Sequence, residues 1–156
     1  QDLNMHRQVQ LIISGGIRNG ADVAKAMALG ADAVSIGSAA MIAIGDNDPK
    51  WNNDYKKLGS EAGAFDDWHE GKDPAGITTQ EPKLTKRLDP IKAGKRLSNY
   101  LKVITLEAQT LARACGKNSL HNLEPEDLCA LTVESAAMAR IPLAGTNWIP
   151  GKNVYE

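Results

Sequence analysis

The sequence has few cysteines and no long apolar run, and these absences exclude several classes of protein. Its two cysteines, Cys115 and Cys129, are too few for a disulfide scaffold and do not form a CxxC pair, so we expect both to be reduced. No stretch approaches the roughly 20 apolar residues of a membrane-spanning helix. Eighteen basic and nineteen acidic side chains leave a formal net charge of −1, which provides no field for nucleic acid or an anionic membrane. We therefore expect a cytoplasmic protein that binds neither.

What is present is organised around residues 11–45, where two short apolar runs are each followed by glycine. The runs at residues 9–13 and 33–36 have the continuous apolar pattern of strands buried on both faces. Between them, Asn19 is placed to cap a helix that Gly30 would end. The stretch therefore predicts two successive strand-loop-helix units.

Each predicted strand leads into a loop that contains glycine. Ser14, Gly15 and Gly16 follow the first strand, and Gly37 and Ser38 follow the second. Glycine allows the backbone N–H groups to approach an anion closely, and each loop precedes a helix whose first N–H groups are unpaired. Ordinary tight turns that bind nothing are the alternative interpretation. Two such loops in succession are typical of the cofactor-phosphate site of a (β/α)8 barrel, and this pairing favours phosphate binding.

These residues also resemble a known family. The string SGGIRNGADVAKAMALGADAVSIGSAAMIAIG is similar to the end of the FMN-binding barrel of glutamate synthases, in particular the shorter glutamate-synthase-like large subunits of bacteria and archaea. The similarity continues through DPAGITTQEPKLTKRLDP, HNLEPEDLCAL and AAMARIPLAGTNWIPG. These strings resemble most the glutamate-synthase-like subunit that accompanies N-methylglutamate synthase and related glutamine-utilising clusters.

The resemblance implies an α/β fold: the C-terminal portion of a (β/α)8 TIM barrel, followed by a long loop and an α-helical C-terminal extension. We expect the last two βα units at residues 1–45, a long aromatic-containing loop at 46–80 and a helical extension with a docked tail at 81–156. Because a complete barrel needs about 250 residues, we expect a C-terminal fragment of a longer chain.

The resemblance also implies FMN as the cofactor, with Ser14, Gly15 and Gly16 matching the first phosphate loop and Gly37 and Ser38 the second. The implied reaction forms glutamate or an N-substituted glutamate from 2-oxoglutarate and an amine or glutamine-derived ammonia. Separate glutaminase-type and electron-donor subunits, and an oligomer, are implied partners. No catalytic residue is assigned in this chain. Another FMN-dependent barrel, such as a hydroxy-acid oxidase or a nucleotide-isomerase relative, and a non-catalytic scaffold subunit remain alternatives.

Residues 46–80 depart from the family. In the large glutamate synthases this region carries three cysteines that hold an iron–sulfur cluster, whereas here one of those positions is Asp73 and the segment has no cysteine. A hard-metal site is an alternative, but a solvated acidic loop is favoured, so we expect no metal. The residues considered as ligands are His69, Asp66, Asp67, Glu70 and Asp73.

Large rings in the same segment argue that it is ordered. They are Trp51, Tyr55, Phe65 and Trp68. After residue 80, apolar side chains at helical spacing predict a mostly helical stretch at 81–115 that Gly116 caps. They are Leu84, Leu88, Leu97, Leu101, Ile104, Ala108 and Leu111 or Ala112. His121 is interpreted as structural, a helix with proline first is expected at Pro125, and a further helix is expected at 131–139 before a tail docked through Trp148.

Overall fold

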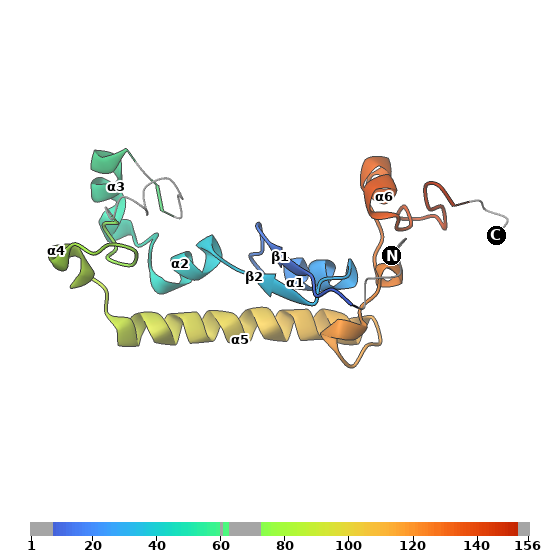
Figure 1. The fold of residues 1–156 in the computed structure, drawn as a ribbon, viewed down its shortest axis with the longest axis horizontal. Coiled ribbons are helices and arrows are strands. Elements are labelled where there is room, and N and C mark those ends of the chain that lie inside the picture. The colour runs from blue at the N-terminus through green and yellow to red at the C-terminus, as the bar shows by residue number, and fades with distance from the viewer. Residues whose placement is uncertain (1–7, 60, 63–72, 153–156) are drawn as a thin grey trace. The chain divides into compact units, whose positions relative to one another are not determined.

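The computed structural model describes residues 8–59, 61–62 and 73–152 and has a mixed α/β fold (Figure 1). The chain divides into two compact units, one of Gln1–Ser35 with Ile104–Glu156 and one of Ile36–Val103. A membrane-spanning helix is absent from the part of the chain that the structure describes.

The first unit begins with a strand-helix-strand motif. Strands β1 (Ile12–Ser14) and β2 (Ala33–Ser35) are parallel, with Ser14 paired to Ser35. Helix α1 (Gly20–Ala28) joins them and lies next to them in Figure 1. The Asn19 side chain accepts a hydrogen bond from the Asp22 N–H at 3.0 Å and caps the helix. The predicted first unit and its cap are therefore confirmed, although both strands are shorter than predicted.

The burial of the strands differs from the prediction. Ile13 and Val34 pack against a cluster formed mainly by α1, but Ile12 on the opposite face is 66% exposed. The reason is that a two-stranded sheet covered by one helix buries only one of its faces. Val9 and Leu11, just before β1, are likewise exposed.

The same cluster joins α1 to the later part of the chain. Its buried members are Ala24, Ala26, Met27, Ala28, Ala31, Ala112 and Leu123. Most are alanines, which allow the helices to approach closely. Gly20 shows the same closeness, because an added Cβ would overlap the Glu107 Cβ and the backbone N of Ala108 in α5 (Pro90–Ala114).

After α5, the first unit continues with short helices. Three-residue 3₁₀ helices occupy Leu120–Asn122 (η3) and Pro125–Asp127 (η4), and α6 spans Val133–Ala139. The helix predicted at Pro125 is thus a single 3₁₀ turn, in which the side chains of Glu124 and Asp127 form a capping box. Positive φ at Gly116, 74°, is consistent with its predicted capping role.

The tail docks on the strand-like residue before α6. Ala130 N–H donates to the Pro142 carbonyl and Ala144 N–H donates to the Ala130 carbonyl, both at 2.8 Å. Leu143 N–H donates to the carbonyl of Trp148, a residue that is 41% exposed. The described part of the tail is thus held beside Ala130 by backbone hydrogen bonds, whereas Trp148 stays partly exposed.

The second unit contains short helices and the first half of α5. Its elements are α2 (Ser38–Ile44), the 3₁₀ helix η1 (Pro49–Trp51), α3 (Asn52–Leu58), α4 (Pro82–Thr85) and the α5 residues up to Val103. The prediction of a loop at 46–80 was incomplete, because residues 49–58 are helical. Tyr55 is buried, as expected of an ordered segment, whereas Phe65 and Trp68 lie outside the described residues.

The buried stripe of α5 agrees with the prediction except at one position. Ala93, Ile104, Ala108 and Ala112 are buried, whereas Leu101 is 42% exposed. Leu97 and Tyr100 are half-buried and fill the gap. The buried stripe therefore runs through positions 97, 100, 104 and 108, at intervals of three, four and four residues, and position 101 lies outside it.

Candidate functional site

The first glycine loop follows directly from β1. Ser14 ends the strand, and Gly15 and Gly16 have φ values of 99° and 70°, a region that favours glycine. Cβ atoms added to either glycine would meet nothing within 4 Å. Among the described backbone hydrogen bonds, none uses the N–H of Gly15 or Gly16 as donor. The loop therefore exposes consecutive N–H groups beside open space, an arrangement that fits a phosphate group.

The start of α1 is less available to an anion than the sequence predicted. The Gly20 N–H donates to the Glu107 carboxylate at 2.8 Å, and the Asp22 N–H donates to Asn19. The Asp22 carboxylate itself accepts from the Arg18 N–H at 3.1 Å. The Lys25 ammonium, which binds this carboxylate, holds the pKa of Asp22 below its ordinary value. Because the helix start already carries negative charge, the N–H groups of the two glycines are the more available donors in this loop.

The second glycine loop follows β2 and belongs to the other compact unit. Gly37 is the N-cap of α2, with φ −124° and ψ −92°, and is exposed. Its carbonyl accepts from the Ala40 and Met41 N–H groups, so the loop leads directly into the helix. The first turn of α2 has no acidic residue, unlike that of α1. Ser38 is half-buried.

The loop that begins at Asp73 is held by one buried carboxylate. Asp73, 7% exposed, accepts hydrogen bonds from the N–H groups of Ala75 (2.8 Å), Ile77 (2.6 Å) and Thr78 (3.0 Å). Gly76 has φ 78°, and an added Cβ there would overlap the Leu84 carbonyl oxygen. Asp73 therefore has a local structural role at a position where the resemblance places a cysteine.

A second buried acid lies close to this loop. The Tyr55 hydroxyl donates to the Asp46 carboxylate at 2.5 Å, and Asp46 is 2% exposed. Burial, together with the Asp46 carboxylate, raises the pKa of Tyr55 far above its ordinary value, and Asp73 contributes to the same shift. This cluster of Asp46, Tyr55 and Asp73 was not predicted from the sequence. The Asp-Pro-x-Gly string at residues 73–76 was the available signal, because Asp before Pro and Gly is typical of a turn closed by its own side chain.

The remaining candidates from the sequence have structural surroundings. The His121 ring donates through Nε2 to the Asp32 carbonyl at 3.2 Å, which agrees with a structural interpretation. Cys115 and Cys129 are free and exposed. No group of three or more metal-ligating side chains occurs among the described residues. His69, Asp66, Asp67 and Glu70 lie outside them.

Comparison with known proteins identifies the family. The model of the conserved region in glutamate synthase matches residues 1–49 and 64–118, which include both glycine loops and the Asp73 loop. The chain belongs to the glutamate synthase family.

Curated relatives agree with this assignment. The chain is 76% identical over 155 residues to a glutamate synthase large subunit-like protein of Rhizobium meliloti, covering 99% of this chain and 35% of that relative. It is 41% identical over 119 residues to an archaeal glutamate synthase [NADPH] of Methanocaldococcus jannaschii, covering 76% of this chain and 20% of that relative. The chain therefore spans about a third or less of the length of these relatives. No solved structure matches it.

Proposed function

We propose that this chain is part of an FMN-dependent oxidoreductase of the glutamate synthase type. The observation that carries the proposal is the family match over residues 1–49, because that range contains both glycine loops. The open, left-handed backbone of Gly15 and Gly16 supports it, since it fits the approach of a phosphate. We assign Ser14, Gly15, Gly16, Gly37 and Ser38 to the phosphate of FMN.

We further propose that β1, α1, β2 and α2 are the last two βα units of a (β/α)8 barrel. The strands are parallel and connected through a helix, as in a barrel. The exposed face that includes Ile12 supports the proposal, since other strands and side chains of a barrel interior would cover it. Residues 46–80 and 81–156 would then be an insertion and a helical extension.

The proposed reaction forms glutamate or an N-substituted glutamate from 2-oxoglutarate and an amine or glutamine-derived ammonia. FMN, when bound, supplies hydride-transfer chemistry. The contribution of this chain is to hold the cofactor phosphate with backbone N–H groups at the end of β1 and the start of α2. We propose separate glutaminase-type and electron-donor subunits in a cytoplasmic, oligomeric complex.

An iron–sulfur cluster does not fit residues 46–80. The segment has no cysteine, and such clusters are held chiefly by cysteine thiolates. The Asp73 carboxylate is already occupied by three N–H donors. We therefore propose that this region binds no cluster, which iron and acid-labile sulfide analysis of the whole protein would test.

The flavin assignment is tested by two matched substitutions in the whole protein. Gly37→Asp places a negative charge in the second loop, whereas Gly37→Asn adds a side chain of similar size without the charge. Because φ at Gly37 is negative, neither substitution forces a residue with a side chain into the left-handed backbone region. At pH 7 and low salt, we expect the FMN content after purification to fall at least tenfold more in the Asp variant than in the Asn variant, through repulsion of the phosphate.

The wild-type protein should be yellow and contain about one FMN per chain. Equal flavin content in the two variants would refute the assignment of Gly37. A colourless wild-type protein that takes up no FMN would favour a non-catalytic scaffold subunit. Formation of glutamate from 2-oxoglutarate with ammonia, or of an N-substituted glutamate with an amine, would identify the nitrogen donor.

A further inference from the structure

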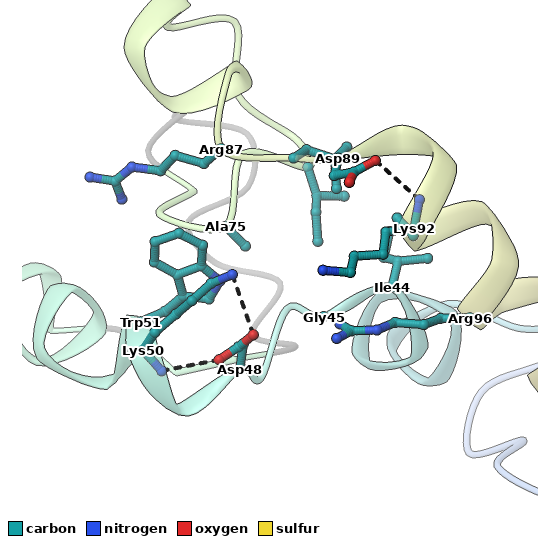
Figure 2. A pocket seen from close by; sticks show the side chains of 13 residues that line it. Ile44, Gly45, Asp48, Lys50, Trp51, Ala75, Arg87, Asp89, Lys92 and Arg96 are labelled. Atoms are coloured by element: carbon teal, nitrogen blue, oxygen red, sulfur yellow. Dashed lines mark hydrogen bonds and ion pairs between the residues drawn. The ribbon is translucent and has the colours of Figure 1, made fainter.

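A cavity of about 230 Å³ lies within the second unit, between the α2–η1 connection, the Asp73 loop and the first turns of α5 (Figure 2). Its lining is strongly charged. Four basic side chains, Lys50, Arg87, Lys92 and Arg96, line it together with two acidic ones, Asp48 and Asp89. Apolar side chains, among them Ile44 and Leu88, form the rest of the wall.

Two of the basic groups already have partners. The Lys50 ammonium pairs with the Asp48 carboxylate at 3.3 Å, and the Arg87 guanidinium pairs with Asp54 at 3.1 Å. Both also lie close to the Trp51 ring, 4.4 Å and 5.1 Å from its centre. The Asp89 carboxylate accepts two backbone N–H groups at the start of α5, each at 3.1 Å. The Lys50 N–H and ammonium hold the pKa of Asp48 below its ordinary value, and the more distant Arg96 guanidinium contributes to the same shift, so Asp48 offsets part of the Arg96 charge.

Lys92 and Arg96 are the two basic residues of the lining for which the described residues supply no ion pair. No hydrogen bond or ion pair of the described residues involves the Lys92 ammonium or the Arg96 guanidinium. Figure 2 shows both side chains extending from α5 into the cavity, toward the side where Trp51 lies. Gly45 provides room for the guanidinium, since an added Cβ would lie 2.9 Å from Arg96 Nη1. The two cations share one space, and among the described residues neither has a carboxylate within ion-pair distance.

This arrangement costs stability when it is empty. Like charges four residues apart on a helix repel each other, and an anion between them removes the repulsion. A planar guanidinium binds two oxygens of a carboxylate or phosphate at once, and an ammonium adds a third contact. The pair is therefore suited to an oxyanion.

We propose that this cavity binds a small organic dianion, either a dicarboxylate or a phosphate monoester, whose oxygens lie between Lys92 and Arg96. A volume of about 230 Å³ is below the roughly 300–1,000 Å³ of pockets for drug-sized ligands, so we expect a ligand with few atoms. The apolar wall accommodates its carbon part. The site is independent of the flavin assignment, because it uses none of the residues assigned to the FMN phosphate.

Titration of the whole protein with two probes tests the proposal and separates the two ligand sources. Succinate represents a dicarboxylate, inorganic phosphate represents a phosphate group, and propionate is the singly charged control. We expect saturable binding of succinate or phosphate by isothermal titration calorimetry, at least tenfold tighter than that of propionate. The affinity should fall as NaCl is raised, because both cations are accessible to solvent.

Three substitutions on α5 locate the binding. Lys92→Gln and Arg96→Gln should each weaken binding about tenfold, because each removes a charge-assisted contact. Lys95→Gln removes the same charge from the same helix but does not line the cavity, so it should weaken binding less than twofold. Circular dichroism and flavin content confirm that each variant is folded.

The proposal is overturned if wild-type protein binds neither succinate nor phosphate, a result that needs no variant. It is also overturned if propionate binds as tightly as both dianions, or if Lys95→Gln weakens binding as much as Arg96→Gln. Loss of dianion binding without loss of FMN in Arg96→Gln supports it and leaves the flavin assignment unaffected.

Discussion

Replacement of Asp73 by alanine tests whether one carboxylate holds the loop at residues 73–78. The carboxylate accepts three N–H groups at 2.6–3.0 Å and is 7% exposed, so alanine leaves three donors without their acceptor. Hydrogen bonds to a charged group contribute about 1.5–3 kcal/mol each. The total is smaller than the sum of three such bonds, because the three donors share one carboxylate and water reaches the two part-buried donors, Ile77 and Thr78, once the side chain is absent. We therefore expect a loss of about 3 kcal/mol in the local free energy of unfolding.

Amide hydrogen exchange in the whole protein measures this local effect. A loss of about 3 kcal/mol corresponds to roughly 100-fold faster exchange at Ile77 and Thr78, because each 1.4 kcal/mol is tenfold. Asp73→Asn should rescue little, because its amide can present only one oxygen to the three donors.

Asp89→Ala is the matched control for Asp73→Ala. The Asp89 carboxylate accepts two N–H groups at 3.1 Å but is exposed, so its loss should cost only about 1 kcal/mol, as for an ordinary helix cap. Asp73→Ala could instead accelerate exchange at residues 75–78 no more than Asp89→Ala does at the start of α5. That result would refute the inference that burial makes the Asp73 carboxylate more stabilising than an exposed helix cap.

Two further predictions concern packing and pH. Gly20→Ala should destabilise the protein by about 2–3 kcal/mol in urea unfolding, because the added Cβ would overlap Glu107 and Ala108. The control Gly94→Ala adds its Cβ in open space and should stabilise the protein by about 0.5–1 kcal/mol. Equal effects of the two substitutions would contradict the close approach of α1 and α5. Asp22→Asn should lower Tm more at pH 6 than at pH 2.5. The lowered pKa of Asp22 contributes stability that is fully present above the unfolded value near 3.8 and is lost as pH falls through the folded value. A Tm difference that is the same at both pH values would show that Asp22 does not act through its charge.

Local signals in the sequence determined the first strand-helix-strand motif and several helix ends. Asn19 caps α1, Gly45 ends α2 with φ 110°, and Gly116 follows α5 with positive φ, as the residue types require. The parallel strands were predicted from two apolar runs around a helix, although they proved shorter. The candidate site residues at the two loops were also placed at strand ends from the sequence, while their binding of FMN stays a prediction.

Tertiary structure decided what depends on residues far apart in the chain. Glu107 satisfies the start of α1 from 87 residues away, so the sequence could not show that this helix end is already occupied. Asp46 and Tyr55 become a buried pair, and Lys92 and Arg96 come to line one cavity, only because other elements surround them. Capping is encoded within a few residues, whereas burial and the balance of charges are properties of the space in which distant segments meet.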